Sequence, residues 1–83
     1  MLIKLNPTVY EYLKVNLAVE NPDLFKYLSF PDNSNSTLEI DEDIAIDVRE
    51  WAGEKLQKVG FDIDDDITQE GKVLEEIVDL FYS

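Results

Sequence analysis

Cysteine and histidine are both absent from this 83-residue chain, and the two absences remove several kinds of chemistry at once. Without cysteine the chain has no disulfide and no thiolate ligand, and without histidine it lacks the commonest zinc ligand and the commonest general base. Three glycines form no phosphate-binding loop, and no serine stands in a nucleophile motif. We therefore expect no enzyme, no cofactor, no catalytic residue and no metal site.

Long hydrophobic runs are also missing. No apolar run approaches the roughly 18 residues of a membrane span, and Asn6-Pro7 interrupts the N-terminus where a signal peptide would have its apolar core. We expect a cytoplasmic protein that does not bind membranes. The 45% hydrophobic and 11% aromatic content is typical of a folded chain, and the length predicts a single acidic helical domain over residues 1–83.

Basic residues are scarce, and the imbalance is uneven along the chain. Residues 1–31 carry three basic and three acidic side chains, whereas residues 32–83 carry four basic and sixteen acidic ones, so the net charge of −12 belongs to the second half. A field of this sign repels nucleic acid and anionic lipid and attracts basic proteins, with association rates that fall as salt rises. The alternative explanation of the acidic residues is solubility.

The clearest helix covers residues 43–59 and is closed by Gly60, which we expect to adopt the left-handed conformation of a helix stop. Trp51 is expected to anchor the core, with a role as a binding hot spot as the alternative. Ile46 and Gly53 point outward, and Gly53 either lets another backbone approach closely or is incidental. The apolar stripe with helical spacing comprises Ile44, Ala45, Val48, Trp51, Ala52, Leu56 and Val59.

The start of this helix has more than one interpretation. Ser36 and Glu39 have the spacing of a capping box, which would begin the helix there. However, Asp41 would then fall at the centre of the apolar stripe, so we favour a break and a fresh cap at Asp41 or Asp43. In the competing interpretation, residues 38–40 form a strand.

Two helix starts are visible in the neutral half, at Asn6-Pro7 and Asn21-Pro22, because asparagine caps free N–H groups and proline suits the first helical turn. They predict helices at about residues 7–20 and 22–30, the second ending before Pro31. The first of these helices is apolar on more than one side. We favour a helix sandwiched between other elements, and the alternative is an exposed apolar patch that meets a partner. The two sets of apolar residues are Val9, Leu13 and Leu17 on one side and Tyr12, Val15 and Val19 on another.

Beyond the central helix the chain alternates apolar and acidic residues, which predicts an extended connection with Phe61, Ile63 and Ile67 turned inward. Thr68 then caps a last helix at about residues 69–82, which should pack antiparallel on the central helix. The predicted fold class is therefore mainly α, a small bundle of about four helices. A short two-strand element over residues 2–5 and 38–40 is the addition that the competing interpretation makes.

The acidic run Asp62–Asp66 raises the question of a calcium site, since calcium takes carboxylate oxygens along a tight loop. The spacing of an EF-hand loop fails, because Ile67 or Gln69 stands where that loop needs its glycine. We interpret the run as a solvated loop whose charge complements the helix that follows.

In size, charge and helical character the chain resembles the small, acidic bacterial immunity proteins that bind and neutralise basic toxin domains, including partners of nuclease colicins and of contact-dependent toxins. The Val48-x-x-Trp51 helix adds to the likeness. Members of the colicin-DNase immunity family carry adjacent tyrosines, whereas here Glu11 separates Tyr10 from Tyr12. The resemblance therefore implies a function but transfers no binding residue.

The hypothesis from the sequence is an acidic protein-binding module, an inhibitor that neutralises a basic toxin or nuclease domain, with mimicry of nucleic acid as a special case. It implies a basic protein partner and no direct binding to nucleic acid. The alternative is a structural or regulatory subunit that self-associates or docks through an apolar helix face. The candidate partner-binding residues are Tyr12, Glu39, Asp41, Glu42, Asp43, Asp47, Glu50, Glu54, Asp62, Asp64, Asp65 and Asp66.

Overall fold

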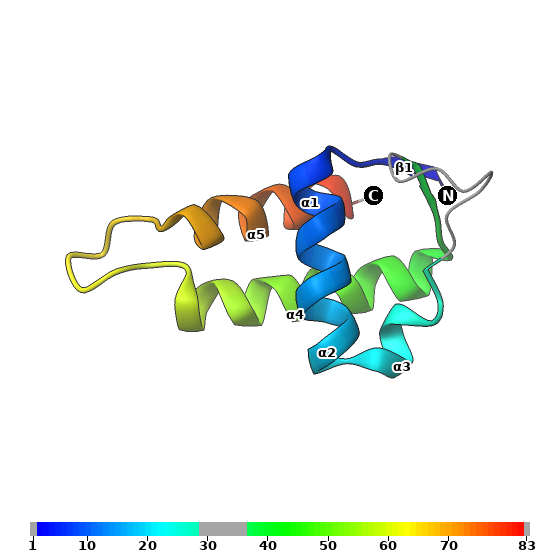
Figure 1. Ribbon diagram of the computed structural model, residues 1–83, viewed down its shortest axis with the longest axis horizontal. Coiled ribbons are helices and arrows are strands. Elements are labelled where there is room, and N and C mark those ends of the chain that lie inside the picture. The colour runs from blue at the N-terminus through cyan, green and yellow to red at the C-terminus, as the bar shows by residue number, and fades with distance from the viewer. Residues whose placement is uncertain (1, 29–36, 83) are drawn as a thin grey trace.

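The computed structural model describes residues 2–28 and 37–82, and in them the fold is mainly α with a short two-stranded sheet, as predicted (Figure 1). α1, η1 and α2 follow one another without a break, so the described residues form four helices. The elements in chain order are β1 (Leu2–Lys4), α1 (Pro7–Tyr12), η1 (Leu13–Leu17), α2 (Ala18–Glu20), α3 (Pro22–Phe25), β2 (Thr37–Glu39), α4 (Glu42–Val59) and α5 (Gln69–Leu80).

The first helix, α1–η1–α2, has the predicted extent of residues 7–20. The side chain of Asn6 accepts a hydrogen bond from the backbone N–H of Val9 at 2.8 Å, and Pro7 occupies the first turn. η1 is a π-helical turn, which is wider than an α turn. Val9, Leu13 and Leu17 are all fully buried, and together they form the side of this helix that faces the core.

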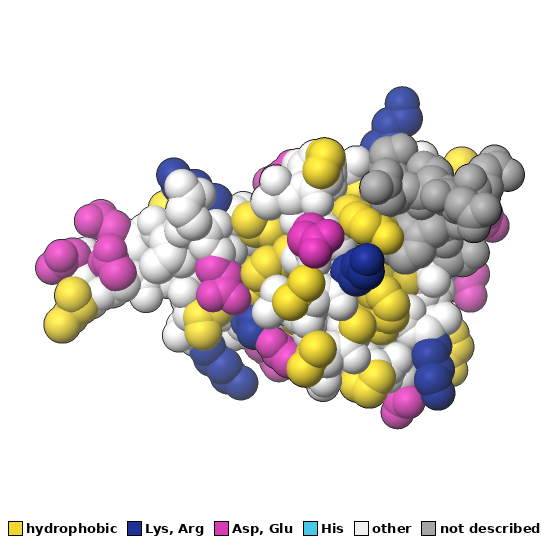
Figure 2. All heavy atoms as spheres, in the orientation of Figure 1, with side chains coloured by type: hydrophobic (Ala, Val, Ile, Leu, Met, Phe, Trp, Pro, Cys, Tyr) yellow, Lys and Arg dark blue, Asp and Glu magenta, His cyan; other side chains and the backbone are white. Residues whose placement is uncertain are grey.

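The prediction that this helix is sandwiched was wrong. Val15 is 54% exposed and Val19 is 77% exposed. The α4–α5 pair lies across one side of the helix only, and Figure 2 shows apolar side chains gathered on the face that the helix turns away from that pair. The second interpretation, an exposed apolar face, is the one that the structure shows.

α3 is shorter than predicted. Asn21 caps it by accepting from the N–H of Leu24 at 3.2 Å, as the sequence indicates, but the helix ends at Phe25 rather than near residue 30. The N–H groups of Tyr27 and Leu28 each bond to the carbonyl three residues back, so the chain turns more tightly there. This turn brings Leu28 into the core. Residues 29 and 30 of the predicted helix lie outside the described residues.

The two strands pair antiparallel, with Ile3 opposite Leu38, which confirms the competing interpretation of the sequence. Both of these residues are buried, while their strand neighbours Leu2 and Glu39 are exposed, as expected for a two-residue alternation. α4 then begins at Glu42, after an extended N-cap residue, which confirms the predicted break. The proposed capping residue Ser36 lies outside the described residues.

α4 and α5 pack antiparallel, as predicted, and both lie along the long axis of the molecule (Figure 1). Thr68 caps α5 by accepting from the N–H of Gly71 at 2.9 Å. Val59 was wrongly assigned to the core: it is 38% exposed, because the last turn of α4 extends beyond the first helix. The buried apolar core consists of Ile3, Leu5, Val9, Leu13, Leu17, Leu24, Leu28, Leu38, Ile40, Ala45, Val48, Ala52, Leu74, Ile77 and Phe81.

Gly60 does not have the predicted left-handed conformation, since its φ is −79° and its ψ is −11°. What requires glycine at this position is the lack of space for a side chain, not the backbone conformation. A Cβ on Gly60 would lie 2.4 Å from the carbonyl oxygen of Leu56, and a Cβ on Gly71 would lie 2.3 Å from the carbonyl oxygen of Gly60. The end of α4 and the first turn of α5 therefore meet backbone to backbone.

The connection between α4 and α5 is a projecting hairpin, so the prediction that its apolar residues turn inward was wrong. Ile63 is 98% exposed and Phe61 is 46% exposed, and only Ile67 is half-buried. Phe61 pairs with Ile67 across the hairpin, and the Asp62 carboxylate accepts from two backbone N–H groups within it. The hairpin extends past the first helix, so no core lies beneath its tip (Figure 1).

Candidate protein-binding groove

A groove lies between α3 and residues 44–54 of α4, and we call it the α3–α4 groove. It has a volume of about 420 Å³, which is within the range of ligand pockets. The tight turn after Phe25 contributes Tyr27 to its wall. The residues that line the groove are Asn21, Asp23, Leu24, Tyr27, Ile44, Asp47, Glu50, Trp51 and Glu54.

Acidic side chains line the groove on both sides. Asp47, Glu50 and Glu54 lie on one face of α4 because their spacing of three and four residues is that of a helix. Within the described residues, none of these three carboxylates forms an ion pair or a hydrogen bond. Asp23 faces them from α3 and has one weak, exposed ion pair, with Lys26 at 3.7 Å. The groove therefore holds negative charge that this part of the chain does not neutralise.

Trp51 forms part of the wall and is held from behind. Its indole N–H donates to a carboxylate oxygen of Glu20 at 3.4 Å, and Glu20 also pairs with the ammonium group of Lys55. The ring of Tyr12 lies 6.2 Å away, centroid to centroid, at a tilt of 50°. Trp51 packs against the core, as predicted, but it also lines the groove. The indole is therefore oriented by neighbours on the side of the first helix.

A smaller hollow of about 110 Å³ continues the groove along α4. It shares Trp51 and Glu54 with the α3–α4 groove, and it adds the ammonium groups of Lys55 and Lys58. Together the groove and the hollow form a path that follows α4 from Ile44 to Val59, a distance of about 22 Å at 1.5 Å per residue. Its charge changes from acidic beside α3 to mixed near the end of α4.

The structure separates the predicted acidic residues into three places. Asp47, Glu50 and Glu54 line the groove. Glu39, Asp41, Glu42 and Asp43 are exposed at the N-terminal end of α4, whereas Asp62, Asp64, Asp65 and Asp66 are exposed in the hairpin beyond its other end. The length of α4 from Asp43 to Val59 separates these two clusters, a distance of about 24 Å at 1.5 Å per residue. One compact basic site could not contact all three places at once.

Tyr12, the one aromatic residue predicted to bind a partner, is engaged inside the fold. Its hydroxyl donates to a carboxylate oxygen of Glu70 at 2.5 Å. Burial, followed by this hydrogen bond and the negative charge of Glu70, raises the pKa of Tyr12 well above its ordinary value. The pair connects the first helix to the first turn of α5.

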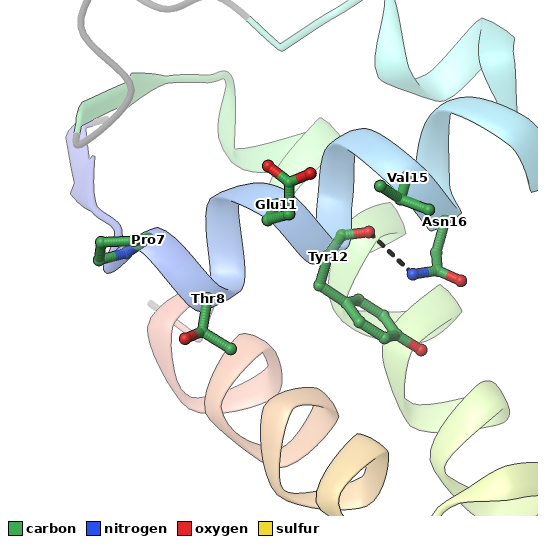
Figure 3. A pocket seen from close by; sticks show the side chains of 6 residues that line it. All are labelled: Pro7, Thr8, Glu11, Tyr12, Val15 and Asn16. Atoms are coloured by element: carbon green, nitrogen blue, oxygen red, sulfur yellow. Dashed lines mark hydrogen bonds between the residues drawn. The ribbon is translucent and has the colours of Figure 1, made fainter.

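The outer side of the first helix has its own shallow hollow, of about 650 Å³, next to Tyr12 (Figure 3). Figure 3 shows the Tyr12 ring directed toward α4, while Glu11 and Val15 lie on the opposite side of the helix. The carboxamide of Asn16 donates to the Tyr12 carbonyl at 3.2 Å, inside the π-helical turn. The hollow is mainly apolar and lies beside the exposed valines of this helix.

Sequence reasoning missed several residues of the groove. Asp23 and Tyr27 lie in the neutral half, so the charge pattern gave no reason to select them. Ile44 was assigned to the core stripe, and it is half-buried at the edge of that stripe. The one available signal was the helix start at Asn21-Pro22. It indicates a second helix directly after the first, and such a helix has to pack against another element of the fold.

Comparisons with protein-family models, with curated proteins and with solved structures found no match to this chain. Among residues 2–28 and 37–82, no helix combines the length and apolar character that crossing a membrane requires. Within the same residues, no group of three or more acidic side chains is placed to hold a metal ion. The candidate site rests on the geometry of the groove.

Proposed function

We propose that this protein is a binding module for a basic protein, and that it acts as an inhibitor of a basic toxin or nuclease domain in the cytoplasm of a bacterium. The observation that carries the proposal is the α3–α4 groove, which Trp51 also lines and where Asp47, Glu50 and Glu54 have no cationic partner among residues 2–28 and 37–82. Carboxylates left unpaired in this way are available to the cationic side chains of another protein.

The acidic surface and the groove have different parts in this function. A net charge of −12 steers a basic partner toward the molecule and accelerates association at low salt. Short-range affinity requires a partly desolvated contact, and aromatic side chains such as Trp51 and Tyr27 commonly provide it. Within the groove the two kinds of contact lie side by side.

Inhibition follows from the kind of partner. A toxin that acts on nucleic acid presents a basic surface to its substrate, and an acidic protein that covers this surface competes with the substrate for it. The exposed clusters at Glu39–Asp43 and at Asp62–Asp66 extend the negative field to both ends of α4. Their role in this proposal is steering, while the groove makes the specific contact.

The experiment is growth rescue by co-expression with a basic toxin encoded next to this gene, with two matched variants. The groove variant is Asp47→Asn with Glu50→Gln, and the control variant is Glu39→Gln with Glu42→Gln, which changes the net charge by the same amount. We expect rescue by the wild type and by the control variant, and loss of rescue by the groove variant. Failure of the wild type to rescue growth, together with no salt-sensitive complex, would contradict the proposal.

The second candidate function is self-association or docking through the outer face of the first helix. The exposure of Val15 and Val19 favours it, because two large apolar side chains lie there on the surface of the described part of the chain. Sedimentation equilibrium tests the self-association. A dimer that persists in high salt and is lost on Val15→Ser with Val19→Ser supports the apolar interface, whereas a monomer at all concentrations excludes self-association.

A further inference from the structure

We infer that the α3–α4 groove recognises arginine in preference to lysine, through a guanidinium group that stacks on Trp51 while Glu50 or Glu54 accepts its hydrogen bonds. The inference rests on the proposed function, since it names the partner chemistry of the same groove. The segment that enters the groove is therefore an arginine-bearing stretch of the partner protein.

The spacing of the carboxylates argues against a compact cation. Asp47 and Glu54 are seven residues apart on α4, which corresponds to about 10 Å along the helix axis. A calcium ion needs six to eight oxygen ligands within about 2.6 Å, and the described residues contain no cluster of that kind. Carboxylates distributed along a groove instead suit cationic side chains that arrive on an extended surface.

The ring of Trp51 distinguishes the two basic side chains. A guanidinium group is planar and weakly hydrated, so it stacks on an aromatic ring and presents paired N–H donors to a carboxylate. An ammonium group is a strongly hydrated point charge and gains less from the ring. Glu50 and Glu54 are one residue before and three residues after Trp51, and all three line the groove. The same groove therefore offers an aromatic ring and carboxylates to one guanidinium group.

The hydrogen bond of the Trp51 indole N–H favours this contact. The N–H is already bonded to Glu20, so a partner that uses the ring does not have to satisfy that donor. The far end of the path attracts cations less than the α3 end, because Lys55 already pairs with Glu20 and Lys58 adds a positive charge beside Glu54. The charge complementarity therefore orients the partner segment, with its arginines beside α3 and an acidic or neutral residue near Lys58.

Trp51 is the single tryptophan of the chain, so its fluorescence reports on the groove directly. We would titrate the protein with acetylated hexaarginine amide and with acetylated hexalysine amide, which carry the same charge, at low salt. The inference predicts at least about fivefold tighter binding of hexaarginine, with a change in Trp51 emission. The groove variant should bind hexaarginine about tenfold more weakly, and the control variant should change less than twofold.

Equal binding of the two peptides, or equal weakening by the groove and control variants, would overturn the inference. Calorimetry on Trp51→Phe gives a second test that needs no tryptophan signal. Phenylalanine keeps an aromatic ring but attracts cations less, so the preference for hexaarginine should shrink, and an unchanged preference would also overturn the inference. Circular dichroism establishes that each variant is folded.

The test of arginine selectivity and the test of the proposed function can fail independently of each other. Growth rescue that depends on the groove, combined with equal affinity for the two peptides, would refute arginine selectivity and leave the inhibitor function standing. Selective binding of hexaarginine without growth rescue would support the inference and count against toxin inhibition.

Discussion

Replacing Tyr12 by phenylalanine removes one hydroxyl and tests how the first helix is joined to α5. The Tyr12 hydroxyl donates to the Glu70 carboxylate at 2.5 Å, and both residues are half-buried. A hydrogen bond to a charged group contributes about 1.5 to 3 kcal/mol when well shielded, and partial exposure lets water replace it. We therefore expect the variant to lose about 1 kcal/mol of stability at pH 7, or about 4–8 °C in melting temperature.

The effect should depend on pH in a defined direction. The pKa of Tyr12 is raised in the folded protein, so above about pH 10 the unfolded chain releases this proton first and the folded state binds more protons. The stability from the Tyr12–Glu70 contact is fully present below that pH and is lost as pH rises. The limiting slope is about 1.4 kcal/mol per pH unit, and solvent screening of a half-buried phenol reduces it.

The assay is urea unfolding of the wild type and of Tyr12→Phe, followed by circular dichroism at pH 7.0, 9.0 and 10.5. The difference in unfolding free energy should be constant between pH 7.0 and 9.0 and should narrow at pH 10.5. The two proteins differ only at residue 12, so the comparison cancels the contributions that they share. Equal stability at pH 7.0, or a difference that does not narrow, would refute the reasoning.

Three further substitutions test the backbone and the caps by thermal or urea unfolding. Gly71→Ala should destabilise the protein by about 2 kcal/mol, because its Cβ would lie 2.3 Å from the Gly60 carbonyl oxygen, and an unchanged melting temperature would contradict this close contact. Gly53→Ala should stabilise the isolated protein by about 1 kcal/mol, since a Cβ there meets nothing within 4 Å, and a lower melting temperature would contradict that. Thr68→Ala should cost about 1 kcal/mol through loss of the α5 cap, and no loss would show that the cap contributes nothing.

The helices were predictable where local chemistry decides the structure. Asn6, Asn21 and Thr68 each accept from a backbone N–H three residues ahead, as their positions before a helix indicate. The sheet was predictable only as an alternative, because three residues per strand give a weak pattern. Its pairing is stabilised by the burial of Ile3 and Leu38, which depends on the rest of the fold.

The errors have a common cause, which is that periodicity does not reveal what lies opposite an element. Ile63 alternates with acidic residues as an inward-facing residue would, yet the hairpin that carries it projects beyond the core. Gly60 has the sequence context of a left-handed helix stop, but what excludes a side chain there is its close contact with Leu56 in the preceding turn of α4. The contact between Tyr12 and Glu70 joins residues 58 positions apart, and no local pattern predicts it.

Only one wall of the α3–α4 groove was predictable from the sequence. Helical spacing placed Asp47, Glu50 and Glu54 on one face of the central helix, and that face does line the groove. The opposite wall depends on how α3 crosses α4, which sequence spacing does not show. Charge density alone pointed equally to the hairpin at Asp62–Asp66, which the structure shows as an exposed loop.

The central claim is that the α3–α4 groove, rather than the densest cluster of acidic residues, binds a basic partner. The most direct measurement is a titration of the isotope-labelled protein with acetylated hexaarginine amide, followed by amide chemical shifts. We predict the largest shift changes at Asp47, Glu50, Glu54 and the indole N–H of Trp51, with small changes in the hairpin. Largest changes at Asp62–Asp66, with the indole signal unmoved, would contradict the claim.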